Sequence, residues 1–249
     1  MSPEIISSPQ NPRIKRLRRL STGKDPDEEW FLLEGRSVIR EALGRGWELE
    51  AIYHTAGRGI PTAATTSLQV SEKVMQSVST LDQSPGILAV ARKHYARMEE
   101  ISLKGRSLLL AGIQDPGNLG ALLRSAAAFG VSTVLSSPGT AHFYNPKVVR
   151  AAMGAMFQLQ LCENVKAGDL ATLLDENQAE LIVADSGSGE DPRSLSRQGK
   201  YVLALGHETL GVSREFRALA KRQVRIPISS ATQSLNVAVA GSILLYELA

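Results

Sequence analysis

A single arginine stands in an otherwise apolar stretch near the middle of the chain. Arg124 follows two leucines and precedes an alanine-rich run, and the glycine- and proline-containing segment 114–120 lies just before it. Such a turn between a strand and a helix lets backbone groups approach a ligand. A guanidinium is a poor base, but it stabilises negative charge on an oxygen or a phosphate. We therefore expect Arg124 to be a buried side chain at a functional site; a structural arginine on an apolar helix is the alternative.

The segment 226–236 near the C-terminus has the composition of a binding loop. Ile226-Pro227-Ile228 is strand-like, and six of the seven residues in 229–235 are Ser, Thr, Ala or Gln, with no charge among them. A loop of small uncharged residues folds tightly and lets its backbone contact a ligand. Ser234 is also a candidate N-cap for the helix that follows.

A third polar position lies between these two segments in the chain. The apolar run 201–206 predicts a strand that ends on Gly206, and Ser213 can begin a short helix after it. Glu208 lies between the two elements, at the end of the strand. Neither helix capping nor core packing explains a carboxylate there, so Glu208 is a further candidate site residue.

These segments occur in the order of the three signature motifs of the SpoU/TrmH group of SPOUT RNA methyltransferases, which they resemble. The strings are QDPGNLGALLRSAAAFG from 114, LALGHETLGVS from 203 and IPISSATQSLNVAVAGSILLYEL from 226. Two N-terminal strings, SSPQNPRIKRLRRL and FLLEGRSVIREAL, resemble the substrate-binding domain of the ribosomal RNA members. The resemblance thus covers most of the chain. It implies transfer of a methyl group from S-adenosylmethionine to a ribose 2′-hydroxyl of RNA, with 23S-type ribosomal RNA as the favoured substrate.

Several alternatives stay open at this point. A transfer RNA 2′-O-methyltransferase, a noncatalytic RNA-binding relative and an antibiotic-resistance enzyme that methylates ribosomal RNA would share these motifs. A nucleotide-dependent dehydrogenase is disfavoured, because segment 114–120 has neither the GxGxxG pattern nor the P-loop pattern.

The resemblance also implies roles for individual residues. The active-site positions are Asn118, Arg124, Glu208, Ser234 and Asn236. Backbone groups that hold the cofactor would belong to Leu205, Gly206, Ile226, Ile228 and Leu235. Arg124 would activate the 2′-hydroxyl, and the group that accepts its proton is left open. The chain departs from the family pattern in having Thr209 and Ser230 where glycine is usual and Ile228 where methionine is usual.

The alternation of strand and helix patterns predicts an α/β protein with two domains. We expect an N-terminal RNA-binding domain over residues 1–95, a linker over 96–106 and a SPOUT domain with a mostly parallel sheet over 107–249. The resemblance adds a trefoil knot and a homodimer with its sites near the interface. Expected strands are 49–54, 86–92, 108–113, 131–136, 180–184, 201–206 and 224–228. Expected helices are 11–20, 34–44, 70–78, 119–129, 145–156, 170–176, 213–220 and 234–248, and 57–67 is expected to be a loop.

Positive charge is concentrated at the N-terminus. The net charge of the chain is only +3, yet residues 1–24 contain six cations against Glu4 alone. The expected helix 11–20 has Ile14 and Leu17 on one side and cations around the rest. This pattern indicates contact with an RNA backbone. A solvated helix face is the alternative, and so few apolar residues argue against a membrane surface. The predicted RNA-binding residues are Arg13, Lys15, Arg16, Arg18 and Arg19.

Composition restricts the remaining possibilities. With 249 residues, 43% hydrophobic and 21% charged, the chain has the composition of a globular protein. No uncharged apolar run approaches the roughly 18 residues of a membrane span, and the first residues lack a signal pattern. Cys162 is the only cysteine and is expected in the core, and the histidines show no metal-ligand spacing. We therefore expect a cytoplasmic protein with no metal and no membrane partner.

Overall fold

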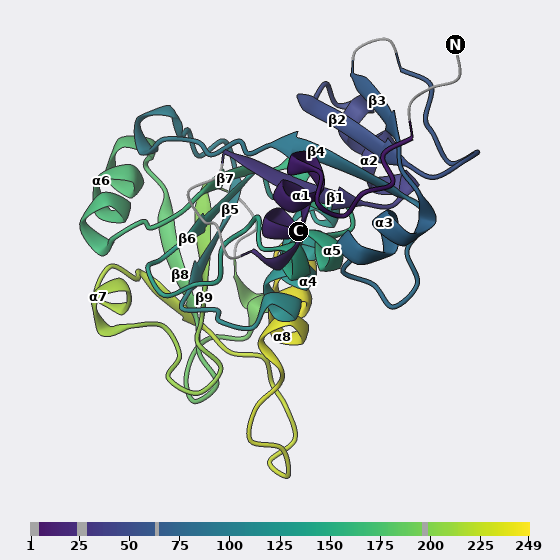
Figure 1. The fold of residues 1–249 in the computed structure, drawn as a ribbon. Coiled ribbons are helices and arrows are strands. Elements are labelled where there is room, and N and C mark those ends of the chain that lie inside the picture. The colour runs from purple at the N-terminus through teal and green to yellow at the C-terminus, as the bar shows by residue number, and fades with distance from the viewer. Residues whose placement is uncertain (1–4, 24–28, 63–64, 196–198) are drawn as a thin grey trace. The chain divides into compact units, whose positions relative to one another are not determined.

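The computed structural model describes residues 5–23, 29–62, 65–195 and 199–249 (Figure 1). Glu4 and Lys24 of the basic N-terminal segment lie outside the described residues. The chain divides into two compact units, Met1–His94 with Tyr144–Phe157 and Tyr95–Phe143 with Gln158–Ala249. The segment Tyr144–Phe157 thus packs with the N-terminal residues, although it follows the first strands of the second unit. The domain boundaries expected from the sequence stay a prediction.

The first unit is built on a four-stranded sheet with the order β1-β4-β2-β3. Strand β4 is antiparallel to β1 and β2, and β3 is parallel to β2. Helices α1 and α3 cover one face, where their apolar side chains meet alternate residues of the strands. Helices α2 and α5 both pack against β1. The strands are β1 (Trp30–Glu34), β2 (Leu49–His54), β3 (Thr66–Gln69) and β4 (Ile87–Arg92), and the helices are α1 (Pro12–Thr22), α2 (Arg36–Gly44), α3 (Glu72–Val78) and α5 (Pro146–Ala152).

Helix α1 has clear start and stop signals. The Asn11 side chain accepts a hydrogen bond of 2.9 Å from the Arg13 amide, Pro12 is the first helical residue, and Gly23 ends the helix in the left-handed conformation. Ile14, Leu17 and Leu20 recur every three residues and are all buried in the core under the helix. The basic helix predicted from the sequence is therefore confirmed, and one side of it is part of the core.

The second unit contains a six-stranded sheet with the order β10-β8-β9-β5-β6-β7. Every described strand pair in it is parallel. Helices α6 and α7 lie on one side of the sheet and α4 and α8 on the other (Figure 1). The strands are β5 (Arg106–Ala111), β6 (Thr133–Ser136), β7 (Gln160–Cys162), β8 (Glu180–Ala184), β9 (Tyr201–Gly206) and β10 (Arg222–Val224). The helices are α4 (Pro116–Ala128), α6 (Ala167–Asn177), α7 (Arg214–Arg217) and α8 (Val237–Glu247).

The predicted α/β class with a mostly parallel sheet is confirmed, and the trefoil knot stays a prediction. Three described strands, β1, β3 and β7, were not expected, and β3 lies within the expected 57–67 loop and its border. All three are short strands that pair with other parts of the chain, and so local pattern does not reveal them. Short 3₁₀ helices occur at Met98–Glu100, Ala155–Gln158 and Pro192–Ser194.

Two boundaries near the C-terminus differ from expectation. The last strand ends at Val224 rather than 228, and the last helix begins at Val237 rather than at Ser234. The N-cap is Asn236, whose side-chain oxygen accepts hydrogen bonds from the amides of Ala238 (2.9 Å) and Val239 (3.2 Å). The expectation that Ser234 caps this helix is therefore wrong. Residues 225–236 form a segment outside helix and strand that extends away from the sheet (Figure 1).

Candidate active site

Four connections leave the same edge of the parallel sheet in the second unit. They follow β5, β8, β9 and β10, and these four strands are consecutive in the sheet, in the order β10-β8-β9-β5. The carboxyl edge of a parallel sheet is where ligands bind in open α/β folds, because the connections converge there. All three segments singled out from the sequence belong to these connections.

Three of the predicted active-site residues form a hydrogen-bonded cluster. The Asn118 amide nitrogen donates to a carboxylate oxygen of Glu208, and the Asn236 amide nitrogen donates to the Asn118 side-chain oxygen at 3.0 Å. We call these residues the Asn118–Glu208–Asn236 cluster. Glu208 and Asn236 are exposed and Asn118 is half-buried, so a substrate can reach the cluster. The fold thus brings together side chains that are more than a hundred residues apart in places.

Helix capping and side-chain hydrogen bonds together fix the two asparagines. The Asn118 backbone N–H donates to a carboxylate oxygen of Asp115, the N-cap of α4, at 2.8 Å, and the Asn118 side chain is held by Glu208 and Asn236. Asn236 uses its oxygen to cap α8 and its nitrogen to contact Asn118. Each asparagine therefore has a defined side-chain direction before any ligand arrives, which is the preorganisation that a catalytic or binding site needs.

A cavity opens beside this cluster. Its lining includes all five residues predicted to hold a cofactor, Leu205, Gly206, Ile226, Ile228 and Leu235, and also Glu208 and Ser234. Leu205, Val237 and Leu244 are buried and give the cavity an apolar floor. Gly206 at the end of β9 and the segment with Ile226 and Ile228 line the same cavity beside this floor. An apolar surface bordered by backbone donors and acceptors suits a ligand that has a flat heterocycle and a polar tail.

Glycines keep the elements around the cavity close together. A Cβ at Gly206 would lie 2.1 Å from the Gly211 carbonyl carbon, and a Cβ at Gly241 would lie 2.4 Å from Leu122 and 2.5 Å from Leu205. Real side chains do not approach so closely, and so neither position accepts a larger residue without movement. The loop after β9 therefore returns directly onto the strand end, and α8 packs tightly on α4 and β9.

Arg124 is placed differently from the expectation. The side chain is exposed, not buried, and Arg124 is not among the residues that line the cavity in the described part of the chain. Six residues along an α-helix correspond to about 9 Å of rise and to faces about 120° apart, so Asn118 and Arg124 point from α4 in different directions. Helix α4 is largely apolar, and its buried side consists of residues such as Leu119, Leu122 and Leu123. Arg124 is not on that side.

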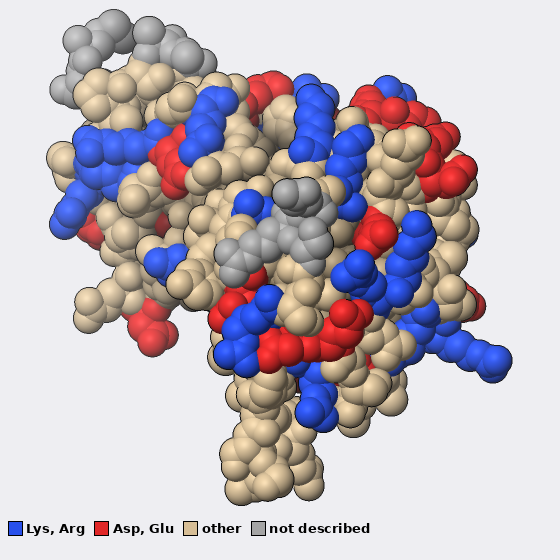
Figure 2. Space-filling view, turned by 180° about the vertical axis from the view of Figure 1, so that it is seen from behind, with Lys and Arg blue, Asp and Glu red and all other residues tan. Residues whose placement is uncertain are grey.

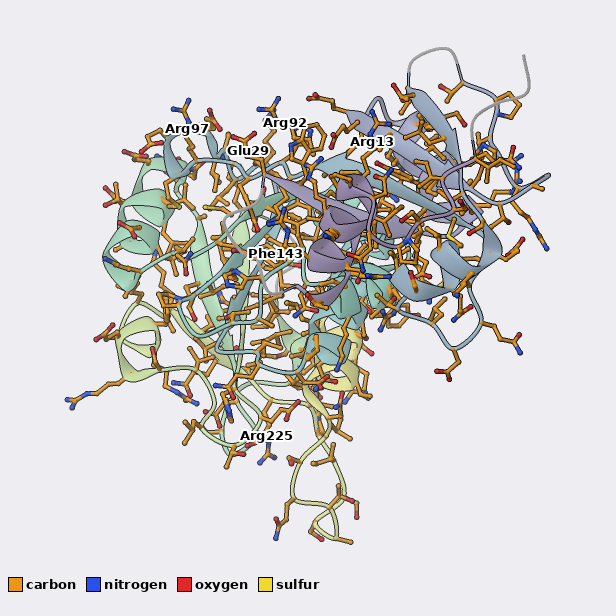
Figure 3. All side chains as sticks on the ribbon, in the orientation of Figure 1. Arg13, Glu29, Arg92, Arg97, Phe143 and Arg225 are labelled. Carbon is orange, nitrogen blue, oxygen red and sulfur yellow. The ribbon has the colours of Figure 1, made fainter. Side chains whose placement is uncertain are left out.

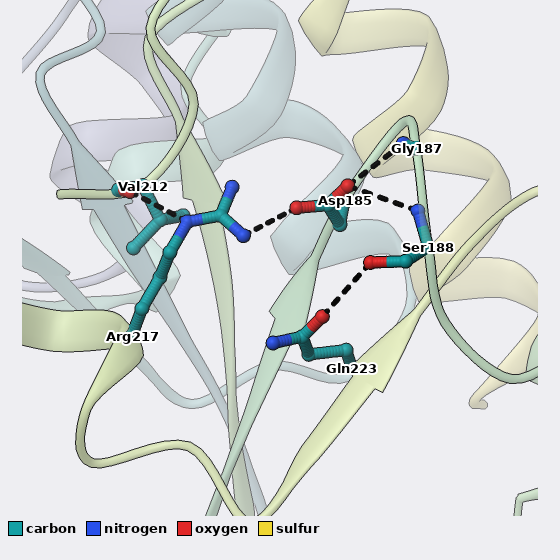
Figure 4. Close-up of polar contacts among 6 residues, drawn as sticks. All are labelled: Asp185, Gly187, Ser188, Val212, Arg217 and Gln223. Carbon is teal, nitrogen blue, oxygen red and sulfur yellow. Dashed lines mark hydrogen bonds and ion pairs between the residues drawn. The ribbon is translucent and has the colours of Figure 1, made fainter. Parts of the chain in front are cut away.

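Among the charged residues that line the cavity, Asp185 and Arg217 were not singled out from the sequence. They form an ion pair between the connection after β8 and helix α7 (Figure 4). The position of Asp185 directly after a buried strand is a signal that could have found it. Arg217 belongs to a four-residue helix in a charged stretch and has no comparable signal.

In the first unit the predicted RNA-binding residues fall into two groups. Arg16 binds both carboxylate oxygens of Glu50 at 2.6 and 2.7 Å, and Arg18 donates to the Ser77 hydroxyl at 3.0 Å and more weakly to the Pro9 carbonyl. Both side chains are half-buried, whereas those of Arg13, Lys15 and Arg19 are exposed. These last three are the ones that α1 presents to solvent.

Opposite charges accompany the cations elsewhere in the first unit. Arg92 pairs with Glu29 at 3.4 Å and with Glu48 at 3.2 Å, and Figure 3 shows Arg92 and Glu29 side by side. On the face shown in Figure 2, positive and negative side chains are interspersed rather than separated. Basic residues are therefore available for a polyanion on α1 but do not form a continuous patch over that face.

The described residues contain no group of three or more His, Cys, Asp or Glu side chains that could hold a metal ion. No helix in the described ranges is long and apolar enough to cross a membrane. Cys162 is buried in the core of the second unit, as expected, and burial raises the pKa of its thiol to about 11.

Comparison with known proteins agrees with the motifs. Residues 105–246 match the family model of the SpoU rRNA Methylase family, and residues 11–89 match the MRM3-like substrate binding domain. The 23S rRNA (guanosine(2553)-2′-O)-methyltransferase RlmP of Bacillus subtilis is 29% identical over 98% of each chain. The 23S rRNA (uridine(2479)-2′-O)-methyltransferase of Streptomyces viridochromogenes is 25% identical over 87% of this chain and 81% of its own length.

A solved structure extends the similarity to the whole fold. The crystal structure of an AdoMet-bound rRNA methyltransferase from Sinorhizobium meliloti superposes with a TM-score of 0.88 at 26% identity, covering 98% of this chain and 97% of that one. Because the family model covers more than half of the sequence and the fold agrees over nearly all of it, this chain belongs to the SpoU rRNA methylase family.

Proposed function

We propose that this chain transfers a methyl group from S-adenosylmethionine to a ribose 2′-hydroxyl of 23S-type ribosomal RNA. The observation that carries the proposal is the Asn118–Glu208–Asn236 cluster beside a cavity with an apolar floor. Relatives that match this chain over most of their length are named for this reaction on 23S rRNA, and a similar solved structure contains bound AdoMet. A noncatalytic RNA-binding relative would not need all three polar side chains of the cluster to be held together by hydrogen bonds.

The cavity fits the proposed cofactor. The apolar floor suits the adenine, and the backbone of Leu205, Gly206, Ile226, Ile228 and Leu235 would hold the two ends of the molecule. When bound, S-adenosylmethionine supplies an electrophilic methyl group on a positively charged sulfur, and its transfer leaves a neutral thioether.

The residues of the chain then have to orient the ribose and to stabilise the oxygen that attacks. The cluster offers a carboxylate and two amides in fixed orientations, which can hold hydroxyl groups of the ribose by hydrogen bonds. Ser234 lines the same cavity and adds a hydroxyl. Positive charge for the developing oxyanion or the adjacent phosphate would come from Arg124 of a second copy of the chain, and Glu208 is a carboxylate that lines the same cavity.

We also propose that two copies of the chain form the working enzyme. Helix α8 contains no charged residue before Glu247, and Val239 and Tyr246 are 49% and 65% exposed. A helix that is apolar on all sides ordinarily has a partner on each of them. Arg124 points from a different side of α4 than Asn118, so an arginine contributed by a second copy would complete the site. The cytoplasm is the compartment proposed for this reaction.

Binding and product mapping test the proposal together. Calorimetry with S-adenosylmethionine in the presence of a chelator should show binding to the folded protein without added metal. Incubation with ribosomal and transfer RNA transcripts, followed by mapping of methylated riboses, should give a 2′-O-methyl group in the ribosomal RNA. Absence of cofactor binding at millimolar concentration, or modification of transfer RNA alone, would overturn the assignment. Sedimentation of the same sample should give the mass of a dimer.

A further inference from the structure

The loop that carries Glu208 is held from outside by an ion pair. The Arg217 side chain donates through Nη1 to a carboxylate oxygen of Asp185 and through Nε to the Val212 carbonyl at 2.9 Å (Figure 4). Asp185 follows β8, Val212 ends the loop after β9, and Arg217 is the last residue of α7. One arginine thus joins three connections at the carboxyl edge of the sheet.

Asp185 is fixed in turn by its own connection. Its second carboxylate oxygen accepts hydrogen bonds from the amides of Gly187 at 2.7 Å and Ser188 at 3.1 Å. The Ser188 hydroxyl donates to the Gln223 side chain on β10 at 3.1 Å (Figure 4). The carboxylate therefore cannot swing away from Arg217 without breaking the turn, and the arginine has a rigid partner.

The loop returns against the strand end directly under this arginine. His207 and Gly211 exchange two backbone hydrogen bonds of 2.8 and 3.1 Å, which close the loop that contains Glu208. Gly211 has a φ of 67°, and a Cβ there would lie 2.9 Å from the Arg217 guanidinium. Gly206, Gly211 and Arg217 are therefore stacked in contact, with the arginine outermost. Removing the guanidinium therefore removes the contact that α7 makes with the loop at Gly211.

Both members of the pair line the cavity, and they are poorly hydrated. The side chains of Asp185 and Arg217 are 14% and 32% exposed. Loss of one partner from such a pair leaves an uncompensated charge. Here that charge would stand in the wall of the cavity proposed to hold a sulfonium cation.

We propose that Asp185 and Arg217 form a clamp that positions the Glu208 loop and, as a neutralised pair, adds no net charge of its own to the cavity wall that faces a cationic cofactor. We call this pair the Asp185–Arg217 clamp. The inference rests on the proposed function, because that function supplies the cation. Neither residue touches the reacting atoms in this account; both are positioning residues that act through the loop and through the field in the cavity.

The clamp predicts opposite charge effects for its two halves. S-adenosylmethionine and S-adenosylhomocysteine differ by one methyl group and one positive charge. Asp185→Asn leaves the guanidinium alone and should reduce the preference for the cation over the neutral thioether by roughly threefold or more, since like charges repel in a partly desolvated cavity. Arg217→Gln leaves the carboxylate alone and should raise that preference by a similar factor.

A double variant separates charge from positioning. Asp185→Asn with Arg217→Gln carries no unpaired charge, so it should fold and should regain the wild-type preference between the two ligands. Its loop is still unclamped, and so turnover should stay below wild type by roughly tenfold. Arg222→Gln is the matched control, because Arg222 is a half-exposed arginine paired with Glu180 at 3.7 Å and does not line this cavity. It should leave preference and turnover unchanged.

Titration calorimetry of both ligands, methyl-transfer rates and melting temperatures make up the experiment. Opposite shifts of the ligand preference in the two single variants, with the double variant restored, support the clamp. Preference within twofold of wild type in both single variants, or wild-type turnover in the double variant, would overturn it. Failure of the wild-type protein to bind S-adenosylmethionine would instead overturn the proposed function.

Discussion

In the first unit, charged side chains stand on a helix whose opposite side is core, whereas in the second unit the polar side chains stand on connections at the ends of strands. On α1, Ile14, Leu17 and Leu20 anchor the helix, and two of its arginines are engaged by Glu50 and Ser77. In the second unit, Asn118, Glu208 and Asn236 contact one another and contribute little to the core.

In the second unit, the residues expected to carry function are therefore largely distinct from those that stabilise the fold. In the first unit, helix α1 contributes to both. A change at the loop residues of the second unit should alter binding or catalysis with little loss of stability. A change in α1 alters stability whenever it reaches the apolar side, and only substitutions on the exposed side report on RNA. The predictions below follow from this contrast.

Deletion of residues 1–24 should unfold the first unit. Truncation of one buried Leu or Ile to Ala costs about 2–5 kcal/mol, and three such residues leave together, against a total stability of about 5–15 kcal/mol for a domain. A melting curve should show loss of a cooperative transition. Because Ile14, Leu17 and Leu20 belong to the core, this deletion does not isolate the contribution of the basic residues to RNA binding. A truncated protein that melts at the wild-type temperature would contradict the inference that α1 stabilises the first unit.

Arg124→Ala should reduce methyl transfer by about 10²–10³-fold, because loss of a group that stabilises transition-state charge has costs of this size. The melting temperature should change little, since the side chain is exposed. Arg97→Ala is the control, because Arg97 (Figure 3) is an exposed arginine of the same unit that pairs with Glu100, three residues along the chain. Near wild-type turnover of the Arg124 variant would show that this arginine is structural.

Much of the second unit can be predicted from its sequence. Apolar runs bounded by polar residues predict β8 and β9 with the observed bounds, and the loop positions of Asn118, Glu208 and Asn236 follow from the motifs. The sequence alone does not decide between neighbouring residues that suit the same structural role equally well. Ser234 and Asn236 are both good N-caps, and only the packing of α8 decides for Asn236.

Longer-range features are harder to predict for a related reason. Segment 144–157 has a helical pattern, but its place beside the N-terminal sheet depends on contacts far away in the chain. Asp185 directly follows a buried strand, but Arg217 has no comparable signal in the sequence, so their meeting across two connections is not predictable from local pattern. Because helix α4 is largely apolar, the sequence predicts that Arg124 is buried. The helix nevertheless has one exposed face, and Arg124 lies on it.

Replacement of Arg13, Lys15 and Arg19 by glutamine should weaken RNA binding and leave the melting temperature unchanged. Each phosphate contact contributes roughly 0.7–0.9 to the slope of log affinity against log salt. If all three residues contact phosphate, the slope should fall by roughly 2–3 units. Arg16→Gln is the control; it removes the ion pair with Glu50 and should cost stability of about 1 kcal/mol or less with little change in slope. An unchanged slope in the triple variant would place the RNA-binding surface elsewhere.

Asn236→Ala and Ser234→Ala should differ in stability. Loss of the N-cap hydrogen bonds to Ala238 and Val239 should cost about 1 kcal/mol, whereas Ser234 caps nothing. Both variants should lose activity, because both positions border the cavity or its polar cluster. Chemical denaturation measures the difference directly. Equal stability of the two variants would show that the cap contributes nothing in solution.

The smallest expected effect is the response of the Asp185–Arg217 clamp to acid. Burial alone would raise the pKa of Asp185, but hydrogen bonds from Arg217, Gly187 and Ser188 outweigh it and lower the pKa below its ordinary value. A carboxyl group whose pKa is lowered by folding stabilises the folded state above its unfolded pKa of about 3.9, and this contribution is lost as the pH falls through the folded pKa. The melting temperature of Asp185→Asn should therefore lie below wild type at neutral pH, and the gap should narrow below about pH 4. Melting curves of both proteins between pH 7 and pH 3 measure the gap. A gap that stays constant over this range would mean that the Asp185 charge contributes nothing to folding and that the second unit, like the exposed side of α1, does not depend on its charges for stability.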